Sequence, residues 1–170
     1  MSSSLLYRNN FLLHLQERQE YDRPVLLKEL AYEQPTSAQL AQLHNEYAIN
    51  RQLADVPGVR PVYAKEGSES QPVLFLEYIQ GQSLSELIQG ESLDLRQKLQ
   101  LAVSIAGALS RIHEQQVMHK DICSSNILVA DDSASSSQDG TYIIDFGVAT
   151  TARQEEPKNA NLGNRISFKI

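Results

Sequence analysis

The polar residues of this chain are most concentrated in one short stretch, His119-Lys120-Asp121-Ile122-Cys123-Ser124-Ser125-Asn126. An apolar run, Ile127-Leu128-Val129, follows directly, so we predict a loop that leads into a buried strand. A loop held in this way keeps Asp121 and Asn126 at the mouth of a cleft. These two side chains are therefore the first candidates for a functional site.

A second acidic group, Asp145-Phe146-Gly147, follows a second apolar run. Between the two apolar runs, residues 131–140 are rich in Ser, Asp and Gly, which predicts a hairpin with a solvated tip. The two strands of one hairpin bring Asn126 and Asp145 close together. Amide and carboxylate oxygens suit Mg²⁺, which keeps phosphate oxygens in its coordination shell. Asp121 then remains free to orient an attacking hydroxyl group and accept its proton.

The first half of the chain is predicted to be rich in strands and to contain one helix. The apolar runs Val25-Leu26-Leu27 and Val73-Leu74-Phe75-Leu76 each follow a proline and are typical of strands. A helix is expected from Thr36 or Ser37, as the N-cap, to about Leu53. Apolar residues at spacings of three and four give this helix one buried face: Leu40, Leu43 and Tyr47.

The second half is predicted to be helical as far as the hairpin. Ser83 and Glu86 have the spacing of a capping box, which indicates a short helix, and Gly81 marks a hinge before it. A longer helix is expected over about 94–115. The apolar stripe of this helix consists of Leu95, Leu99, Ala102, Ala106, Leu109 and Ile112. From Thr150 onward we assign no structure, because the sequence is polar and aperiodic.

Composition restricts the class of protein. The 170 residues carry a net charge of −6, with 41% hydrophobic and 21% charged residues, as expected for a folded soluble domain. The acidic balance argues against a nucleic-acid partner, and no apolar run is long enough for a membrane helix. Cys123 is the single cysteine and the N-terminus lacks the pattern of a signal peptide, so we expect a cytoplasmic protein.

Four motifs together resemble those of the protein kinase family. The stretch 119–126, H-K-D-I-C-S-S-N, is similar to the catalytic loop H-R-D-x-x-x-x-N, and 145–147 matches D-F-G. The run 25–28, V-L-L-K, looks like the V-A-I-K strand, and Glu46 falls on the following helix where the partner glutamate belongs. In detail the chain is similar, over about 2–149, to the serine/threonine-kinase-like domain of bacterial multi-domain proteins that also carry an ATPase module and a sensor histidine kinase.

The resemblance implies a role for each matching residue in catalysis. Lys28 would contact the α- and β-phosphates of ATP and form an ion pair with Glu46. Asp121 would be the catalytic base. Asn126 and Asp145 would bind Mg²⁺.

The resemblance also implies an adenosine site. Glu77 and Ile79 match the hinge whose backbone groups hydrogen-bond adenine, with Leu76 behind them. Leu128 would lie under the adenine ring, and Ser83 stands where the family often contacts ribose.

Three positions depart from the family pattern. In an alignment through Leu6-Tyr7-Arg8, Ser4 takes the place of the last glycine of the glycine-rich loop, so the first strand is expected to be missing. Cys123 stands where serine/threonine kinases usually carry a lysine. No A-P-E motif follows residue 147, and the tail 163–170 does not look like a kinase continuation, so the chain is interpreted as truncated at both ends.

The sequence thus predicts an α+β, protein-kinase-like fold with a strand-rich N-lobe, 1–79, and a partial helical C-lobe, 80–170, in which the apolar stripe of the long helix is partly exposed. The leading function is transfer of phosphate from ATP, with Mg²⁺, to a serine or threonine of a protein. Alternatives are a catalytically impaired nucleotide-binding regulatory module, an inactive fragment, and a small-molecule kinase of the antibiotic-phosphotransferase type. The intact D-F-G motif favours a protein kinase, whose protein substrate and oligomeric state the sequence leaves open.

Overall fold

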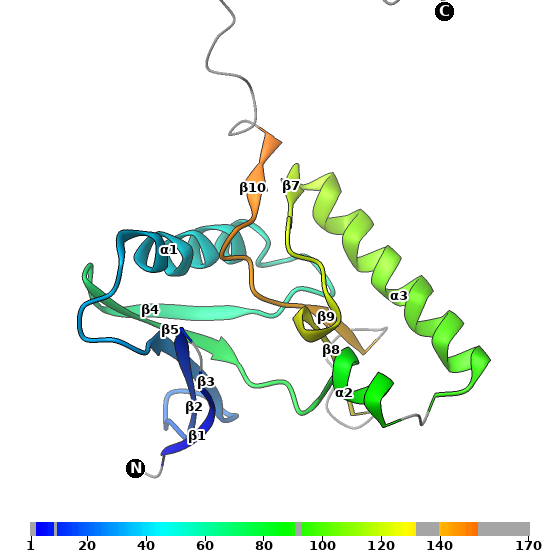
Figure 1. Ribbon diagram of the computed structural model, residues 1–170, viewed down its shortest axis with the longest axis horizontal. Coiled ribbons are helices and arrows are strands. Elements are labelled where there is room, and N and C mark those ends of the chain that lie inside the picture. The colour runs from blue at the N-terminus through cyan, green and yellow to red at the C-terminus, as the bar shows by residue number, and fades with distance from the viewer. Residues whose placement is uncertain (1–2, 9, 91–92, 132–139, 153–170) are drawn as a thin grey trace, which may run out of the picture.

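The computed structural model describes residues 3–8, 10–90, 93–131 and 140–152, and the structural statements below concern these residues. The chain forms a strand-rich part from its first half and a helical part from its second half (Figure 1). The fold is α+β, as predicted. The predicted boundary at residues 79 and 80 falls in the connection between the last strand of the first part and the first strand of the second.

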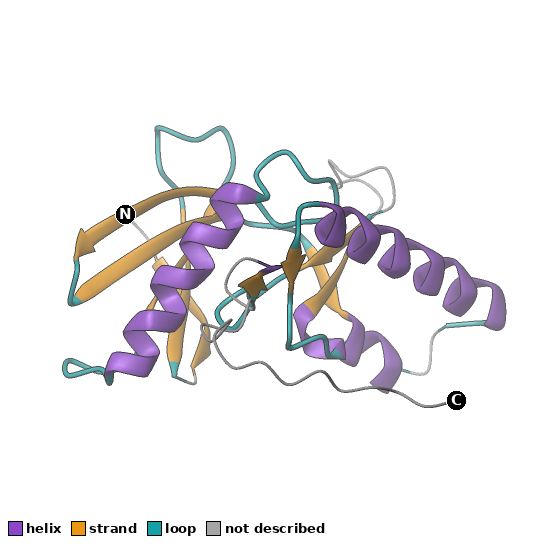
Figure 2. Ribbon diagram, turned by 90° about the horizontal axis from the view of Figure 1, so that it is seen from above, coloured by secondary structure: helices purple, strands orange, loops and turns teal. Residues whose placement is uncertain are grey.

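The strand-rich part is one antiparallel sheet with strand order β1-β2-β3-β5-β4. Its strands are β1 (Ser3–Arg8), β2 (Phe11–Gln16), β3 (Val25–Leu30), β4 (Val62–Ser68) and β5 (Gln71–Glu77). One helix, α1 (Ser37–Gln52), packs across the sheet (Figure 2). The two predicted strands and the predicted helix are confirmed, and Thr36 is the N-cap.

The N-terminal strand corrects one expectation from the sequence. Ser4 lies inside β1 and pairs with Leu15 of β2, so it does not stand in the turn that joins the two strands. The turn lies between Arg8 and Leu12, which face each other across the hairpin. The first strand is therefore present, and the alignment that put a glycine-loop position at Ser4 is wrong. It failed because strand pairing, which a short local motif does not reveal, sets the register.

Helix α1 links two apolar cores. Leu43 packs in a cluster with residues of the sheet, among them Leu26 and Leu74. Ile49 and Leu53, at the end of the helix, instead join the cluster of the helical part. The predicted buried face is confirmed, because Leu43 is fully buried and its two predicted companions pack against the same cluster. A helix held by both cores gives fixed positions to the polar residues between its two apolar ends.

The helical part contains α2 (Leu84–Gln89), α3 (Leu95–Glu114) and a 3₁₀ turn, η1 (Ser124–Asn126). Strands β6 (Gly81–Ser83), β8 (Ile127–Ala130) and β9 (Thr141–Ile143) form a small antiparallel sheet in the order β6-β8-β9. The predicted hairpin is confirmed as β8 and β9. Most of its predicted tip, and the tail from residue 153 onward, lie outside the described residues.

One further strand pair was not expected. β7 (Val117–Met118) pairs with β10 (Thr150–Thr151), so the assignment of no structure from Thr150 is wrong for these two residues. Two-residue strands carry no periodicity, and only the folded chain brings them together. The predicted capping box at Ser83 is confirmed as the cap of α2. The long helix begins where predicted, and Asp94 caps it with a second capping box that the sequence analysis did not single out.

The burial of α3 differs from the predicted stripe. Leu95 and Leu99 are 73% and 59% exposed, whereas Ala108 and Ile112 are buried. The helix packs against β7 and β9, and its buried residues lie in its C-terminal half. Ala102 and Ala106 of the predicted stripe are also exposed, while Ala108, which was not part of it, is buried. The buried face of α3 is therefore not the predicted one, because the helical period alone does not fix which apolar residues meet the sheet. The expected partial exposure of the predicted stripe is confirmed. None of the described helices is long and apolar enough to cross a membrane.

Candidate active site

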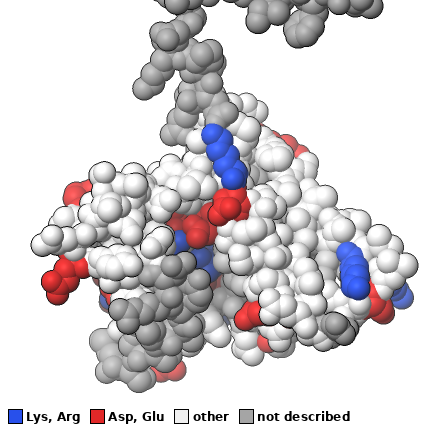
Figure 3. All heavy atoms as spheres, viewed as in Figure 1, with Lys and Arg blue, Asp and Glu red and all other residues white. Residues whose placement is uncertain are grey.

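A pocket of about 830 Å³ lies between the strand-rich and the helical part. Acidic and basic atoms gather in the hollow that faces the viewer in Figure 3. Seven of the residues predicted for a functional site line this pocket: Lys28, Ile79, Ser83, Asp121, Asn126, Leu128 and Asp145. The predicted residues Glu46, Leu76 and Glu77 are buried, and Ser4 lies within β1, where it pairs with Leu15.

Lys28 and Glu46 form a buried ion pair at the back of the pocket. Strand β3 holds Lys28 at 4% exposure, α1 holds Glu46 at 1%, and Nζ lies 2.6 Å from Oε2. The ring of Phe11 covers the ammonium at 4.6 Å. Two charges taken out of water need close mutual contact, and this geometry supplies it. The pair therefore holds the Lys28 ammonium at a fixed point.

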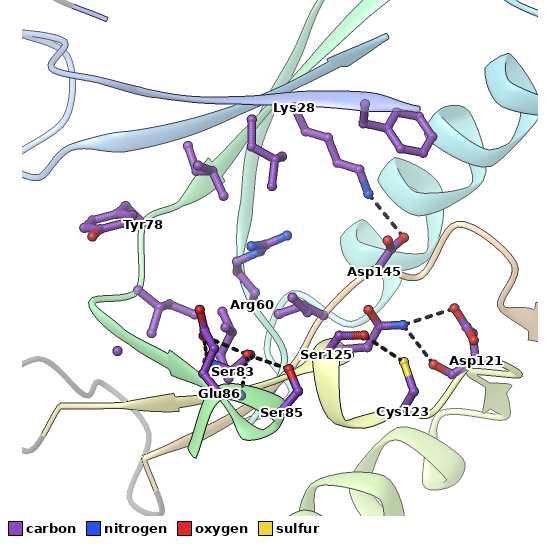
Figure 4. Close-up of a pocket in the computed structure, with 18 of the residues that line it drawn as sticks. Lys28, Arg60, Tyr78, Ser83, Ser85, Glu86, Asp121, Cys123, Ser125 and Asp145 are labelled. Atoms are coloured by element: carbon purple, nitrogen blue, oxygen red, sulfur yellow. Dashed lines mark hydrogen bonds and ion pairs between the residues drawn. The ribbon is translucent and has the colours of Figure 1, made fainter. Parts of the chain in front are cut away.

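Asp145 is the third member of this charged cluster. Its Oδ1 lies 3.2 Å from Lys28 Nζ, and its side chain is 41% exposed. The dashed line between the two residues in Figure 4 marks this contact. The backbone at Asp145 is left-handed, with φ 64°, which turns the residue out of the strand direction. Burial alone would raise the pKa of Asp145, but the charge and hydrogen bond of Lys28 and the Gly147 N–H hold it below the usual value. The group is a carboxylate at neutral pH.

Asn45 fixes the segment that follows Asp145. Its Nδ2 donates to the carbonyls of Phe146, Gly147 and Ala149 at 3.2, 3.1 and 2.8 Å. Asn45 precedes Glu46 on α1, so one helix turn holds both Lys28 and the 146–149 backbone. Asn45 was not predicted as a site residue from the sequence. Its place directly before the predicted glutamate Glu46 was the one sign in the sequence that it lies near the site.

His119 organises the loop that carries Asp121. Its ring is buried against Phe146, with the ring centroids 4.7 Å apart. Nδ1 accepts the Asp121 N–H at 3.2 Å, so Nε2 carries the proton and donates to the Ile144 carbonyl at 2.9 Å. The ring thereby ties the loop to the chain just before Asp145. Lys120 has a left-handed backbone, with φ 66°, which turns the chain between the ring and the carboxylate.

Asn126 connects the same loop to the hairpin. Its Nδ2 donates to the Asp121 carbonyl at 2.9 Å and to Asp121 Oδ2 at 3.1 Å (Figure 4). With the nitrogen turned toward Asp121, the amide oxygen of Asn126 has no partner among the described residues. This oxygen and the Asp145 carboxylate line one pocket, and both suit a hard divalent cation. The described residues hold no group of three or more His, Cys, Asp or Glu that fits a metal ion.

The other end of the pocket is apolar. Leu26, Ile79 and Leu128 line it, together with Tyr78. Behind it, Leu76 is fully buried in the sheet core.

Two polar residues at this end are already engaged. The Glu77 N–H donates to the Pro61 carbonyl at 3.0 Å. Burial raises the pKa of the Glu77 carboxyl, and the charge of Arg23 offsets part of this rise. The hydroxyl of Ser83 forms the capping box of α2, where it accepts the Glu86 N–H and donates to Glu86 Oε2.

Arg60 also lines the pocket, and the sequence interpretation missed it. It stands between Val59 and Pro61, immediately before β4, as a single cation in an apolar run. A lone arginine in such a run was a signal that its side chain is buried.

Comparison with known proteins identifies similar chains. A family model described as protein kinase domain matches residues 14–166. The chain is 25% identical to serine/threonine-protein kinase PrkC of Bacillus subtilis over 130 residues, 76% of this chain and 19% of that protein. It is 28% identical to KEOPS complex subunit Bud32 of Pyrococcus abyssi over 92 residues, 54% of this chain and 38% of that subunit.

A third relative is the probable serine/threonine-protein kinase PknB of Bifidobacterium longum. The two are 30% identical over 112 residues, 65% of this chain and 15% of that protein. In all three comparisons the aligned part spans well under half the length of the relative.

Proposed function

The chain belongs to the protein kinase domain family, and on that premise we propose that it binds ATP with Mg²⁺ and transfers the γ-phosphoryl group to a serine or threonine hydroxyl of a protein. One observation carries the proposal. Strand β3, the 119–126 loop and the segment after β9 bring their polar residues to one pocket between two lobes: Lys28, Asp121, Asn126 and Asp145. Phosphoryl transfer depends mainly on positioning and charge neutralisation, which such a pocket supplies.

At the phosphate end, Lys28 would donate to the α- and β-phosphates. Its buried contact with Glu46 fixes the ammonium and removes most of its freedom before the nucleotide arrives. Asn126 and Asp145 would hold Mg²⁺ through one amide oxygen and one carboxylate. A bound Mg²⁺ neutralises charge on the phosphate oxygens. The lowered pKa of Asp145 supports this role, because only the ionised group is a strong ligand.

Asp121 would act on the acceptor hydroxyl. Its backbone is held by His119 and its Oδ2 by Asn126, so the carboxylate is oriented before a substrate binds. It would orient the hydroxyl and accept its proton as the oxygen–phosphorus bond forms and the bond to the leaving ADP breaks. No covalent enzyme intermediate is part of this proposal.

At the apolar end, the adenine ring would lie between Leu26 and Leu128. The backbone of Glu77 and Ile79 would face its polar edge, with Leu76 behind, and Ser83 would lie beside the ribose. The cytoplasm is the proposed compartment and a protein the proposed substrate.

A second candidate function is a nucleotide-binding regulatory module without transfer activity. Two observations favour it. Cys123 lines the pocket where the family usually has a lysine. The turn between β1 and β2 is also short, with Arg8 already paired with Leu12, so it offers little backbone to cover phosphates.

Nucleotide binding and transfer are tested separately. Mg²⁺-ATP should raise the melting temperature of the wild type and of Asp55→Ala, an exposed control, but not of Asp145→Ala. No rise in the wild type would contradict nucleotide binding. Label from γ-labelled ATP should then appear on serine or threonine of the protein itself or of added proteins. A thermal shift without any labelled protein would instead support the regulatory module.

A further inference from the structure

Arg60 is held rigidly at the wall of the pocket. Val59 forms a bridge with Ile143, and the Arg60 N–H donates to the Ile143 carbonyl at 3.4 Å. On the other side, the Pro61 carbonyl accepts the Glu77 N–H at 3.0 Å. These bonds fix the backbone on both sides of Arg60. Figure 4 shows its side chain rising into the pocket between Tyr78 and Asp145.

The Arg60 guanidinium has no hydrogen-bonding partner among the residues that the structure describes. Only 6% of the residue is exposed, yet no described residue accepts a hydrogen bond from its side chain or forms an ion pair with it. A guanidinium carries five N–H donors, and those of Arg60 face a pocket from which acceptors can reach them. Glu46 Oε1 is buried without a hydrogen-bond partner, so it does not accept a hydrogen bond from the arginine. A structural ion pair with Glu46 therefore does not account for Arg60.

Arg60 lines the same pocket as Lys28 and Asp145 and feels the charges of the acidic groups there. Burial lowers the pKa of Arg60, while the charges of Glu46 and Asp145 raise it. These are the same two carboxylates that Lys28 contacts. Glu77 and Glu86, at the apolar end, do not interact with Arg60 in this way. Arg60 and Lys28 are thus two cations that share one acidic environment.

We propose, on the basis of the function proposed above, that Arg60 is a second phosphate-binding cation of the nucleotide site and donates hydrogen bonds to phosphate oxygens beside Lys28. The planar guanidinium matches two phosphate oxygens at once. Its fixed backbone means that little freedom is lost on binding. The role also fits the rest of the pocket, because Cys123 adds no cation and the β1–β2 turn is short.

The test compares ligands with and without phosphate. Binding constants of adenosine and of ADP with Mg²⁺ are measured by calorimetry for the wild type, Arg60→Met, Arg60→Lys and the exposed control Arg96→Met. Arg60→Met should weaken ADP binding about tenfold or more and change adenosine binding less than about twofold. Arg60→Lys should recover part of the loss, and Arg96→Met should match the wild type.

The outcomes separate this inference from the proposed function. If Arg60→Met weakens the binding of adenosine and of ADP equally, Arg60 contacts the adenine ring or only packs in the wall of the pocket. If ADP binding is unchanged, Arg60 does not contact the nucleotide. Either result overturns the inference. A wild type that binds neither ligand would overturn the proposed function itself. If Arg60→Met does not fold, Arg60→Gln replaces it, and retained adenosine binding shows that the variant is folded.

Discussion

The ammonium of Lys28 lies 2.6 Å from Glu46 Oε2, and both side chains are buried. This contact joins β3 to α1 and fixes the cation that faces the pocket. Asp145 approaches the same ammonium from the second lobe. The two halves of the chain thus meet at one nitrogen atom, and the first predictions concern the groups around it.

Replacing Glu46 by Gln should leave the Lys28 charge buried without a counter-charge at its closest contact. Removing one partner of a buried pair costs about 3–5 kcal/mol, so we expect a loss of this order in the free energy of unfolding. Urea unfolding measures it. The matched control is Glu69→Gln, which removes the exposed partner of Lys65 and should change stability by less than about 1 kcal/mol. If both variants lost similar amounts of unfolding free energy, the buried Lys28–Glu46 pair would contribute no more to stability than an exposed pair.

Asn45→Ala should release the segment after Asp145. The variant loses three hydrogen bonds from α1, which corresponds to about 1–3 kcal/mol of stability. Hydrogen exchange should quicken at the Ala149 amide in particular. Gln52→Ala removes one exposed amide-to-carbonyl bond from the same helix and serves as the control. Unchanged exchange at residues 146–149 in Asn45→Ala would show that the segment is held by other contacts.

The lowered pKa of Asp145 predicts a pH dependence of stability. A carboxyl group whose folded pKa lies below its unfolded value contributes stability above the unfolded pKa, and this contribution is lost as pH falls through the folded value. The wild type should therefore lose more stability than Asp145→Asn between pH 6 and acid pH. Parallel pH profiles of the two proteins in urea unfolding would argue against the ion pair with Lys28.

Two glycine substitutions should have opposite effects. A Cβ at Gly81 would lie 2.1 Å from the Val129 carbonyl oxygen, so Gly81→Ala should separate β6 from β8 and destabilise the protein strongly. Gly107 lies within α3, where an added Cβ meets only the flexible end of Arg111 at 3.4 Å. Gly107→Ala should therefore stabilise the protein by about 0.5–1 kcal/mol. Thermal unfolding measures the melting temperatures of both variants. A Gly81→Ala variant as stable as the wild type would contradict the close approach of β6 and β8.

Local patterns predicted much of this fold. The helix expected between Thr36 or Ser37 and about Leu53 is α1, because capping and apolar spacing are local signals. The hairpin that brings Asn126 and Asp145 to one pocket followed from two apolar runs around a polar loop. The resemblance of four short motifs to those of the protein kinase family implied the Lys28–Glu46 contact, which the structure contains.

Other features depend on contacts distant in the sequence. The position of Ser4 within β1 and the pairing of β7 with β10 are set by strand register. The helical period of α3 does not show which of its apolar residues are covered: Leu95 is 73% exposed, whereas Ile112 is buried. Arg60 was missed because polar residues are assumed to be exposed, and its burial comes from strands on both sides of it.

The most direct test of the account measures phosphate transfer and nucleotide affinity together in the wild type and in Asp121→Asn. The variant keeps the side-chain shape but cannot take up a proton from the acceptor hydroxyl. If Asp121 is the catalytic base, the variant keeps ADP affinity with Mg²⁺ within about twofold of the wild type, while transfer from γ-labelled ATP to serine or threonine falls at least about 100-fold. Equal transfer by the two proteins, or no transfer by the wild type despite nucleotide binding, would contradict the account.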